Sequence, residues 1–96
     1  MDKNDILQKI EKYKLQHYKK YGFNRVGIFG SFTRNTATGL SDIDIIVEQI
    51  KPDLFILGTI KDDLEHELGI KVDIIRLRDG MSDFLRRRIE QEAIYV

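Results

Sequence analysis

The chain has 96 residues, which suits one domain with a single modest core, and residues 1–96 are expected to form that domain. Its 16 basic and 16 acidic residues cancel, so the overall charge favours neither nucleic acid nor a membrane surface as a partner. The lack of cysteine excludes disulfides and thiolate metal sites. Together with a charged N-terminus unlike a signal peptide and no apolar run of membrane-spanning length, these features predict a cytoplasmic protein.

The first expected element is an amphipathic helix with Asn4 or Asp5 as its N-cap and its end near Gly22. His17 could be imagined as a ligand or a base. Since no partner lies near it in the sequence, it is interpreted as a residue of the helix face. The apolar side of the helix is formed by Ile6, Leu7, Ile10, Tyr13 and Tyr21.

A short strand over residues 25–29 is expected to lead into Gly30 and Ser31. Gly30 has no Cβ, so the backbone there can approach a ligand closely. Ser31 offers a hydroxyl and a backbone N–H, and the residues after it could open a short helix whose N-terminus favours an anion. The pattern is typical of phosphate binding only in combination with the strand that follows.

The second expected strand carries Asp42 and Asp44, two residues apart. Successive side chains of a strand point to opposite faces, so both carboxylates project to the same side. The opposite side is apolar and comprises Ile43, Ile45 and Val47. Because two neighbouring carboxylates resist joint ionisation, a hard divalent cation such as Mg²⁺ is expected between them. The polar loop 35–41 before this strand has two open interpretations, a cover over a nucleotide or a plain connector.

A second helix is expected to start near Pro52 and to end at Gly69. Its apolar stripe is Leu54, Leu57, Ile60, Leu64 and Leu68. The acidic residues around His66 could suggest a second metal site, but they are interpreted as the solvated face of this helix.

A third strand over residues 71–77 places Asp73 opposite to its apolar neighbours Val72 and Ile74. Asp73 is interpreted as a third catalytic carboxylate, and the alternative is an aspartate in solvent at a strand end. A last helix, capped by Ser82, carries three consecutive arginines at 86–88. These arginines are expected to pair with acidic neighbours and a partner surface, since no aromatic residues are interleaved for nucleic-acid binding.

With Gly30-Ser31 followed by Asp42-Ile43-Asp44, the chain resembles the minimal nucleotidyltransferases of the DNA polymerase β superfamily. The motif of that family is Gly-Ser, about ten residues, and then Asp-x-Asp. The flanking GIFGSFTRN and SDIDIIVE match as well, and Arg34 is kept. Asn35 stands where the family often has glycine. Asn tolerates positive φ, so the turn is compatible with this departure.

The order of the expected elements predicts an α/β (α+β) fold in which helices pack on a small three-stranded sheet, with the terminal AIYV as a candidate extension of that sheet. The resemblance implies that this small three-stranded sheet is mixed. It also implies nucleotidyl transfer from ATP with two Mg²⁺ ions. The implied catalytic and metal-binding residues are Asp42, Asp44 and Asp73, and the implied nucleotide-binding residues are Gly30, Ser31 and Arg34.

In that minimal family the protein is commonly the antitoxin of a HEPN/MNT toxin–antitoxin pair. The resemblance therefore implies transfer of AMP to a protein hydroxyl, a tyrosine of a partner HEPN toxin. One alternative is a catalytically silent module that neutralises its partner by covering it. The other is transfer to a small molecule, which the lack of an additional substrate domain disfavours.

Overall fold

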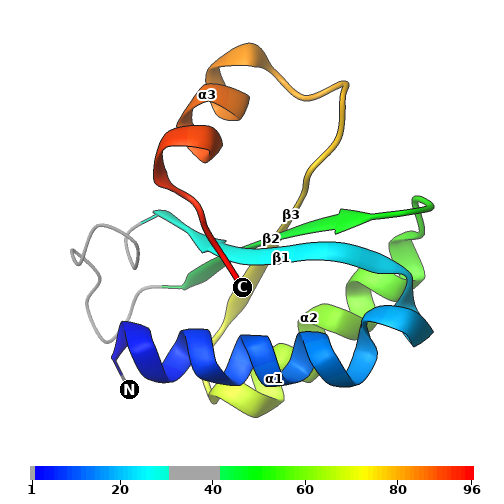
Figure 1. Ribbon diagram of the computed structural model, residues 1–96, viewed down its shortest axis with the longest axis vertical. Helices are drawn as coiled ribbons and strands as arrows, with labels where there is room; N and C mark the ends of the chain where they lie inside the picture. The colour runs from blue at the N-terminus through cyan, green and yellow to red at the C-terminus, as the bar shows by residue number, and fades with distance from the viewer. Residues whose placement is uncertain (1, 31–41) are drawn as a thin grey trace.

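The computed structural model describes residues 2–30 and 42–96, which form helices on both faces of one mixed sheet (Figure 1). The elements are α1 (Lys3–Tyr21), β1 (Phe23–Phe29), β2 (Ile43–Gln49), α2 (Leu54–Leu68), β3 (Val72–Arg76), α3 (Asp83–Glu92) and β4 (Ile94–Tyr95). The sheet order is β3-β2-β1-β4. Strand β1 is antiparallel to β2 and β4, whereas β2 and β3 are parallel.

The predicted mixed α/β fold is confirmed, but the predicted number of three strands is wrong because the sheet has four. The additional strand β4 has only two residues, Ile94 and Tyr95, and pairs with Gly27 and Ile28 of β1. It lies within the terminal AIYV, so the candidate extension of the sheet is confirmed. Two residues are too few to show the alternation by which a strand is recognised in a sequence.

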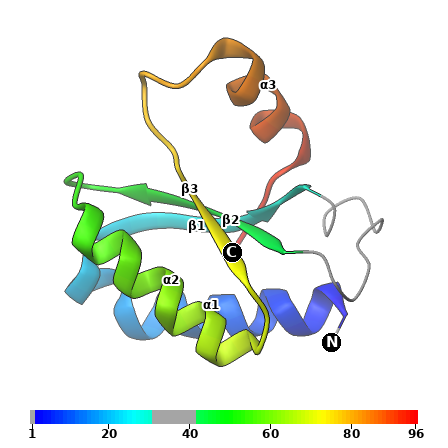
Figure 2. The ribbon, with the colours of Figure 1, turned by 180° about the vertical axis from the view of Figure 1, so that it is seen from behind.

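The two faces of the sheet are covered by different helices (Figures 1 and 2). Helices α1 and α2 pack on one face and enclose the main core, and α3 packs on the other over a smaller cluster. The smaller cluster consists of Phe29, Ile46, Met81 and Ile89. None of the helices in the described part of the chain is both long and apolar enough to cross a bilayer.

Strand β2 has the predicted two-sided character. Ile43, Ile45 and Val47 are fully buried in the main core. Asp44 and Ile46 therefore face α3, and Ile46 is buried in the smaller cluster. Because its side chains alternate between the two faces, β2 contributes residues to both hydrophobic clusters. Asp44, near the start of the strand, is half-buried.

The helix ends follow local capping chemistry. The predicted N-cap of α1 is wrong, because Asp2 caps the helix and Asp5 is the third helical residue of a capping box. The Asp5 backbone N–H donates to Asp2 Oδ1 at 2.9 Å. Helix α2 begins after Asp53 rather than at Pro52, and its predicted end at Gly69 is confirmed. The predicted Ser82 cap of α3 is confirmed as well.

Gly27 allows β4 to lie against β1. A Cβ at this position would lie 2.4 Å from the backbone oxygen of Ile94, closer than a carbon and an oxygen can approach. Gly27 is buried where β4 pairs with β1, and its φ is not positive. The absence of a side chain is therefore a requirement of space rather than of backbone conformation.

Gly27→Ala is expected to lower the free energy of unfolding by roughly 1–3 kcal/mol, because the new methyl group must displace the backbone of β4. Urea denaturation followed by circular dichroism measures this change. Gly80→Ala is the matched control, since a Cβ there meets nothing within 4 Å. Equal stabilities of the two variants would contradict this explanation of Gly27.

A partly buried hydrogen bond joins α1 to α2. The Tyr13 hydroxyl donates to Asp63 Oδ2 at 2.7 Å, and the Tyr13 side chain is 3% exposed. Burial first, and then the hydrogen bond to Asp63, raises the pKa of the Tyr13 hydroxyl well above its ordinary value. Folding therefore favours the protonated phenol, so this contribution to stability is complete below the ordinary tyrosine pKa and decreases above it.

Tyr13→Phe is expected to lower the free energy of unfolding by about 1 kcal/mol at pH 8, through loss of the hydrogen bond. The difference from the wild type should shrink towards pH 11, because only the wild type has a Tyr13 that ionises on unfolding above about pH 10. Urea denaturation at the two pH values tests this. Tyr18→Phe, at a more exposed ring on the same helix, is the control, and a wild-type difference for Tyr13→Phe that stays constant with pH would contradict the assignment.

Candidate active site

The topology brings the described members of the predicted site to one end of the sheet. Strand β1 ends at Phe29, and the antiparallel β2 begins beside it at Ile43. Strand β3 is parallel to β2, so its first residue, Val72, lies at this end too. Near these strand ends lie four residues that we call the carboxylate edge, namely Gly30, Asp42, Asp44 and Asp73.

Asp44 and Asp73 occupy directly neighbouring positions on β2 and β3. Their neighbours in the same two strands, Ile43 and Val72, also pair and are buried in the main core. Because register partners project to the same face, both carboxylates lie on the face that carries α3. Asp44 is half-buried and Asp73 is exposed, so one carboxylate is fixed within the fold while the other faces solvent.

Gly30 lies directly against the Asp44 carboxylate. Its φ is +85°, and a Cβ on its backbone would lie 2.5 Å from Asp44 Oδ2. Both facts favour glycine, because an L side chain would be strained in conformation and would collide with the carboxylate. Gly30, the first residue of the turn predicted for a phosphate, thus lies in contact with one of the predicted metal ligands.

Two of the predicted nucleotide-binding residues, Ser31 and Arg34, lie outside the described residues, as do the loop 35–41 and the expected short helix. Their roles stay predictions. Asp42 is the first described residue before β2 and is exposed.

The described part of the chain brings together two of the three predicted metal ligands. Across residues 2–30 and 42–96, no three His, Cys, Asp or Glu side chains are close enough together to form a metal site. This finding includes Asp42, Asp44 and Asp73 as the structure places them, and also the acidic surroundings of His66. The carboxylate oxygens of Asp44 and Asp73 are nevertheless the kind of ligand that Mg²⁺ prefers. Like charges at neighbouring sheet positions also repel each other, and a cation between them would remove this repulsion.

Residues 7–96 match the family model described as the nucleotidyltransferase domain. The chain belongs to this nucleotidyltransferase family. MJ0128 of Methanocaldococcus jannaschii, whose name proposes a protein adenylyltransferase, is 39% identical over 93 residues, which cover 96% of this chain and 92% of the relative. The protein adenylyltransferase MntA of Thermococcus cleftensis is 31% identical over 96 residues, which cover 94% of this chain and 95% of that protein.

Solved structures agree with this assignment. A proposed minimal nucleotidyltransferase has a TM-score of 0.79 and 33% identity, with 98% of this chain and 95% of that chain covered. A toxin–antitoxin structure with AMP-PNP has a TM-score of 0.76 and 25% identity, with 99% and 72% covered. The complex of the tri-AMPylated Shewanella oneidensis HEPN toxin with an MNT antitoxin shares the fold, with a TM-score of 0.68, 21% identity, and 97% and 70% covered. The fold and activity class implied by the sequence motif are confirmed.

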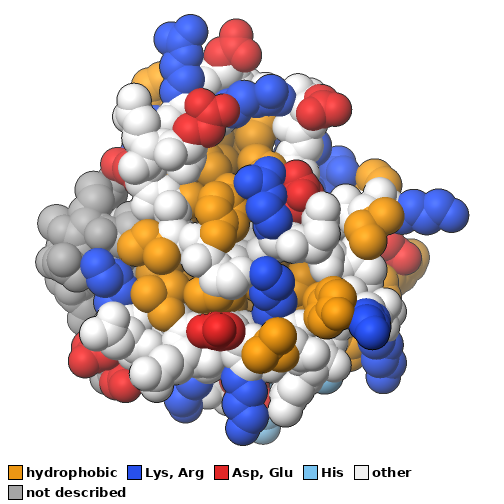
Figure 3. All heavy atoms as spheres, viewed as in Figure 1, with side chains coloured by type: hydrophobic (Ala, Val, Ile, Leu, Met, Phe, Trp, Pro, Cys, Tyr) orange, Lys and Arg blue, Asp and Glu red, His pale blue; other side chains and the backbone are white. Residues whose placement is uncertain are grey.

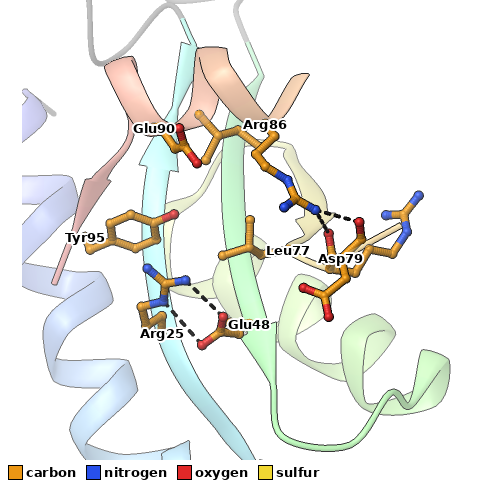
Figure 4. A pocket seen from close by; sticks show the side chains of 9 residues that line it. Arg25, Glu48, Leu77, Asp79, Arg86, Glu90 and Tyr95 are labelled. Carbon is orange, nitrogen blue, oxygen red and sulfur yellow. Dashed lines mark hydrogen bonds and ion pairs between the residues drawn. The ribbon is translucent and has the colours of Figure 1, made fainter. Parts of the chain in front are cut away.

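This nucleotidyltransferase has a second polar feature that sequence reasoning missed, a hollow of about 360 Å³ between the sheet and α3 (Figure 4). Arg25 donates two hydrogen bonds to the Glu48 carboxylate, at 3.2 and 2.9 Å, and its guanidinium lies 5.0 Å from the centre of the Tyr95 ring. Hydrogen bonding to Arg25 lowers the pKa of Glu48. Since Arg25 and Glu48 are register partners across β1 and β2, only knowledge of the strand register could have predicted their pairing.

The space-filling view shows hydrophobic side chains within this region and interspersed acidic and basic side chains around it (Figure 3). Arg86 donates hydrogen bonds to the backbone oxygens of Arg78 and Asp79. Arg88 forms an ion pair with Glu92 one helical turn away, at 3.3 Å. Two of the three consecutive arginines of α3 thus have partners among the described residues. The partner of Arg88 is acidic, as expected, whereas the partners of Arg86 are backbone oxygens.

The contact between Gly30 and Asp44 can be tested by a double-mutant cycle. Gly30→Ala is expected to lower the free energy of unfolding by about 1–3 kcal/mol, from the positive φ and the collision with the carboxylate. In an Asp44→Ala background the same substitution should cost less, because the carboxylate is gone and only the conformational strain remains. Chemical denaturation of the four proteins measures the coupling, and a coupling energy of zero would rule out the collision.

Proposed function

We propose that this nucleotidyltransferase transfers AMP from ATP to a hydroxyl group of a partner protein, a tyrosine of a HEPN-type toxin, and thereby acts as its antitoxin. Support comes from relatives named protein adenylyltransferases that align along nearly the whole chain. A toxin–antitoxin structure with a nucleotide analogue has the same fold over 99% of this chain. The HEPN partner and the tyrosine are what the resemblance to the minimal family implies.

The observation that carries the proposal is the neighbouring placement of Asp44 and Asp73, together with the contact of Asp44 with Gly30. In the proposed reaction, the acceptor oxygen forms a bond to the α-phosphorus of ATP, the bond to the β-phosphate oxygen breaks, and pyrophosphate leaves. Asp73 is the exposed member of the pair, so it is the better placed carboxylate to take the proton from the acceptor hydroxyl.

Asp42, Asp44 and Asp73 are proposed to hold two Mg²⁺ ions, Asp42 on the basis of its motif position. When bound, the ions would supply charge stabilisation for the attacking and leaving oxygens. Gly30 and Ser31 are proposed to bind the β- and γ-phosphates through backbone N–H groups and the serine hydroxyl, and Arg34 to add positive charge. Within this set, the Asp44 carboxylate lies against Gly30.

Asp44→Asn is expected to reduce AMP transfer by about 100-fold or more, because the amide removes one negative charge from the site. The experiment incubates the purified chain with Mg²⁺, ATP and the HEPN protein encoded beside it, and then measures the intact mass of both proteins. Asp73→Asn should reduce transfer as well. Asp62→Asn, at an exposed carboxylate on α2, is the matched control and should leave transfer unchanged.

The outcomes distinguish three activities. Added AMP on the HEPN protein that depends on Asp44 supports protein adenylylation, and undiminished transfer by Asp44→Asn would rule out its role as a metal ligand. A stable complex without added mass would instead show a silent binding module. Transfer to small hydroxyl compounds alone would show an enzyme of small-molecule modification.

A further inference from the structure

A groove of about 650 Å³ lies between α2 and β3, and one of its lining residues is Asp73 of the carboxylate edge. Strand β3 crosses in front of β2 in Figure 2, with α2 beside it. We call this feature the α2–β3 groove and define it by Leu54, Gly58, Lys61, Asp73, Arg76 and Arg78. Because the groove shares Asp73 with the proposed site of transfer, whatever it binds lies next to the chemistry.

No contact among residues 2–30 and 42–96 requires glycine at position 58. Gly58 lies in the interior of the 15-residue helix α2, it is exposed, and a Cβ on it would meet nothing within 4 Å. Glycine is a poor residue for a helix interior, so the position carries a cost that no intramolecular contact among the described residues explains. Its effect is to leave the helix backbone open to close approach from the groove.

Leu54 lies one helical turn before Gly58 at the same groove and is 81% exposed. Lys61 follows Gly58 by three residues, so the positions of Leu54, Gly58 and Lys61 lie on one side of α2. The adjacent Phe55 is 91% exposed. One end of the groove is therefore apolar and accessible, which is suited to an apolar side chain of a partner.

The groove also contains an open sheet edge, since β3 is an end strand of the sheet. The Lys71 carbonyl accepts a backbone hydrogen bond from β2 at 3.0 Å, and the Leu77 N–H donates one to β2 at 2.8 Å. Backbone groups of successive strand residues point alternately to the two edges, so those of Ile74 and Arg76 point outward. Outward backbone groups of this kind pair readily with an added strand.

The charge of the groove favours an acidic partner. Lys61, Arg76 and Arg78 line it opposite a single carboxylate, Asp73, and none of the three bases forms an ion pair with another described residue. No aromatic side chain of the described residues lines the groove, so the stacking surface typical of single-stranded nucleic-acid sites is lacking there.

We infer that the α2–β3 groove binds an extended acidic segment of the acceptor protein, which pairs with the outer edge of β3 and rests an apolar side chain against Leu54. The inference deepens the proposed function and rests on it for the identity of the acceptor. The added segment would hold the acceptor beside Asp73, so the groove supplies recognition while the carboxylate edge supplies the chemistry.

The decisive variant is Gly58→Gln, with the purified HEPN protein encoded beside this chain as the probe. Glutamine favours the helix, so the melting temperature should rise or stay constant. Its side chain fills the groove, so the Kd for the HEPN protein should increase at least tenfold. Lys61→Glu should weaken binding to a similar extent, whereas Lys12→Glu, exposed on α1 away from the groove, is the charge-matched control and should not.

Two further measurements separate this inference from the proposed activity. Hydrogen exchange of the Ile74 and Arg76 amides should slow on binding of the HEPN protein, as strand addition requires. In transfer assays the groove variants should raise KM for the HEPN protein with little change in kcat, and their affinity for ATP with Mg²⁺ should equal that of the wild type.

Each result decides one question. Groove-dependent binding without any AMP transfer would support the docking surface and overturn the proposed activity. Normal transfer and normal binding by Gly58→Gln and Lys61→Glu would overturn the docking surface alone. It would also be overturned if the wild type did not bind the HEPN protein, if the variants lost ATP affinity instead, or if Gly58→Gln changed self-association rather than binding.

Discussion

The register between the parallel strands β2 and β3 is the constraint on which the carboxylate edge depends. Backbone hydrogen bonds between Ile43 and Lys71, at 3.0 Å, and between Leu77 and Val47, at 2.8 Å, fix it at both ends. A slip by one residue would turn Asp73 towards the main core and Val72 towards α3. The register is therefore enforced by the burial of Val72 on β3 together with Ile43, Ile45 and Val47 on β2. The same apolar side chains that stabilise the fold thus hold the two carboxylates together.

Two glycines adapt β1 to its surroundings, one within the strand and one directly after it. Gly27 lets a fourth strand lie against β1, and Gly30 lets the Asp44 carboxylate lie against the backbone directly after β1. Both are requirements of close contact, and Gly30 adds a positive φ. The single strand β1 thus both pairs with the end strand β4 and leads into the candidate site at Gly30.

The sequence contained much of this site because its chemistry is local along the chain. The alternation around Asp42 and Asp44 predicts which face of β2 is buried, and the predicted ends of α2 and α3 follow from Gly69 and Ser82. Features that depend on distant pairing were not predictable in this way. Strand β4 is too short for periodicity, and the N-cap of α1 is ambiguous in the sequence because acidic candidates lie close together.

The contact of Arg25 with Glu48 and the groove at Gly58 depend on tertiary placement alone. A register irregularity between Phe23 and Arg25 shifts the pairing of β1 with β2, so counting along the strands would not have found the ion pair. In the sequence, Gly58 is only a residue that disfavours the helix. The structure adds that no described residue fills the space beside it.

The division of the core between the two faces of the sheet is unequal, and this has a dynamic consequence. Among the described residues, 14 buried side chains form the main core beneath α1 and α2, whereas four form the cluster beneath α3. Local opening has the lowest free energy where the fewest apolar contacts are lost, so α3 is the layer expected to detach first while the rest of the fold stays intact. Since Asp44 and Asp73 lie on the face covered by α3, such excursions would widen the approach to the carboxylates without disturbing the register that holds them.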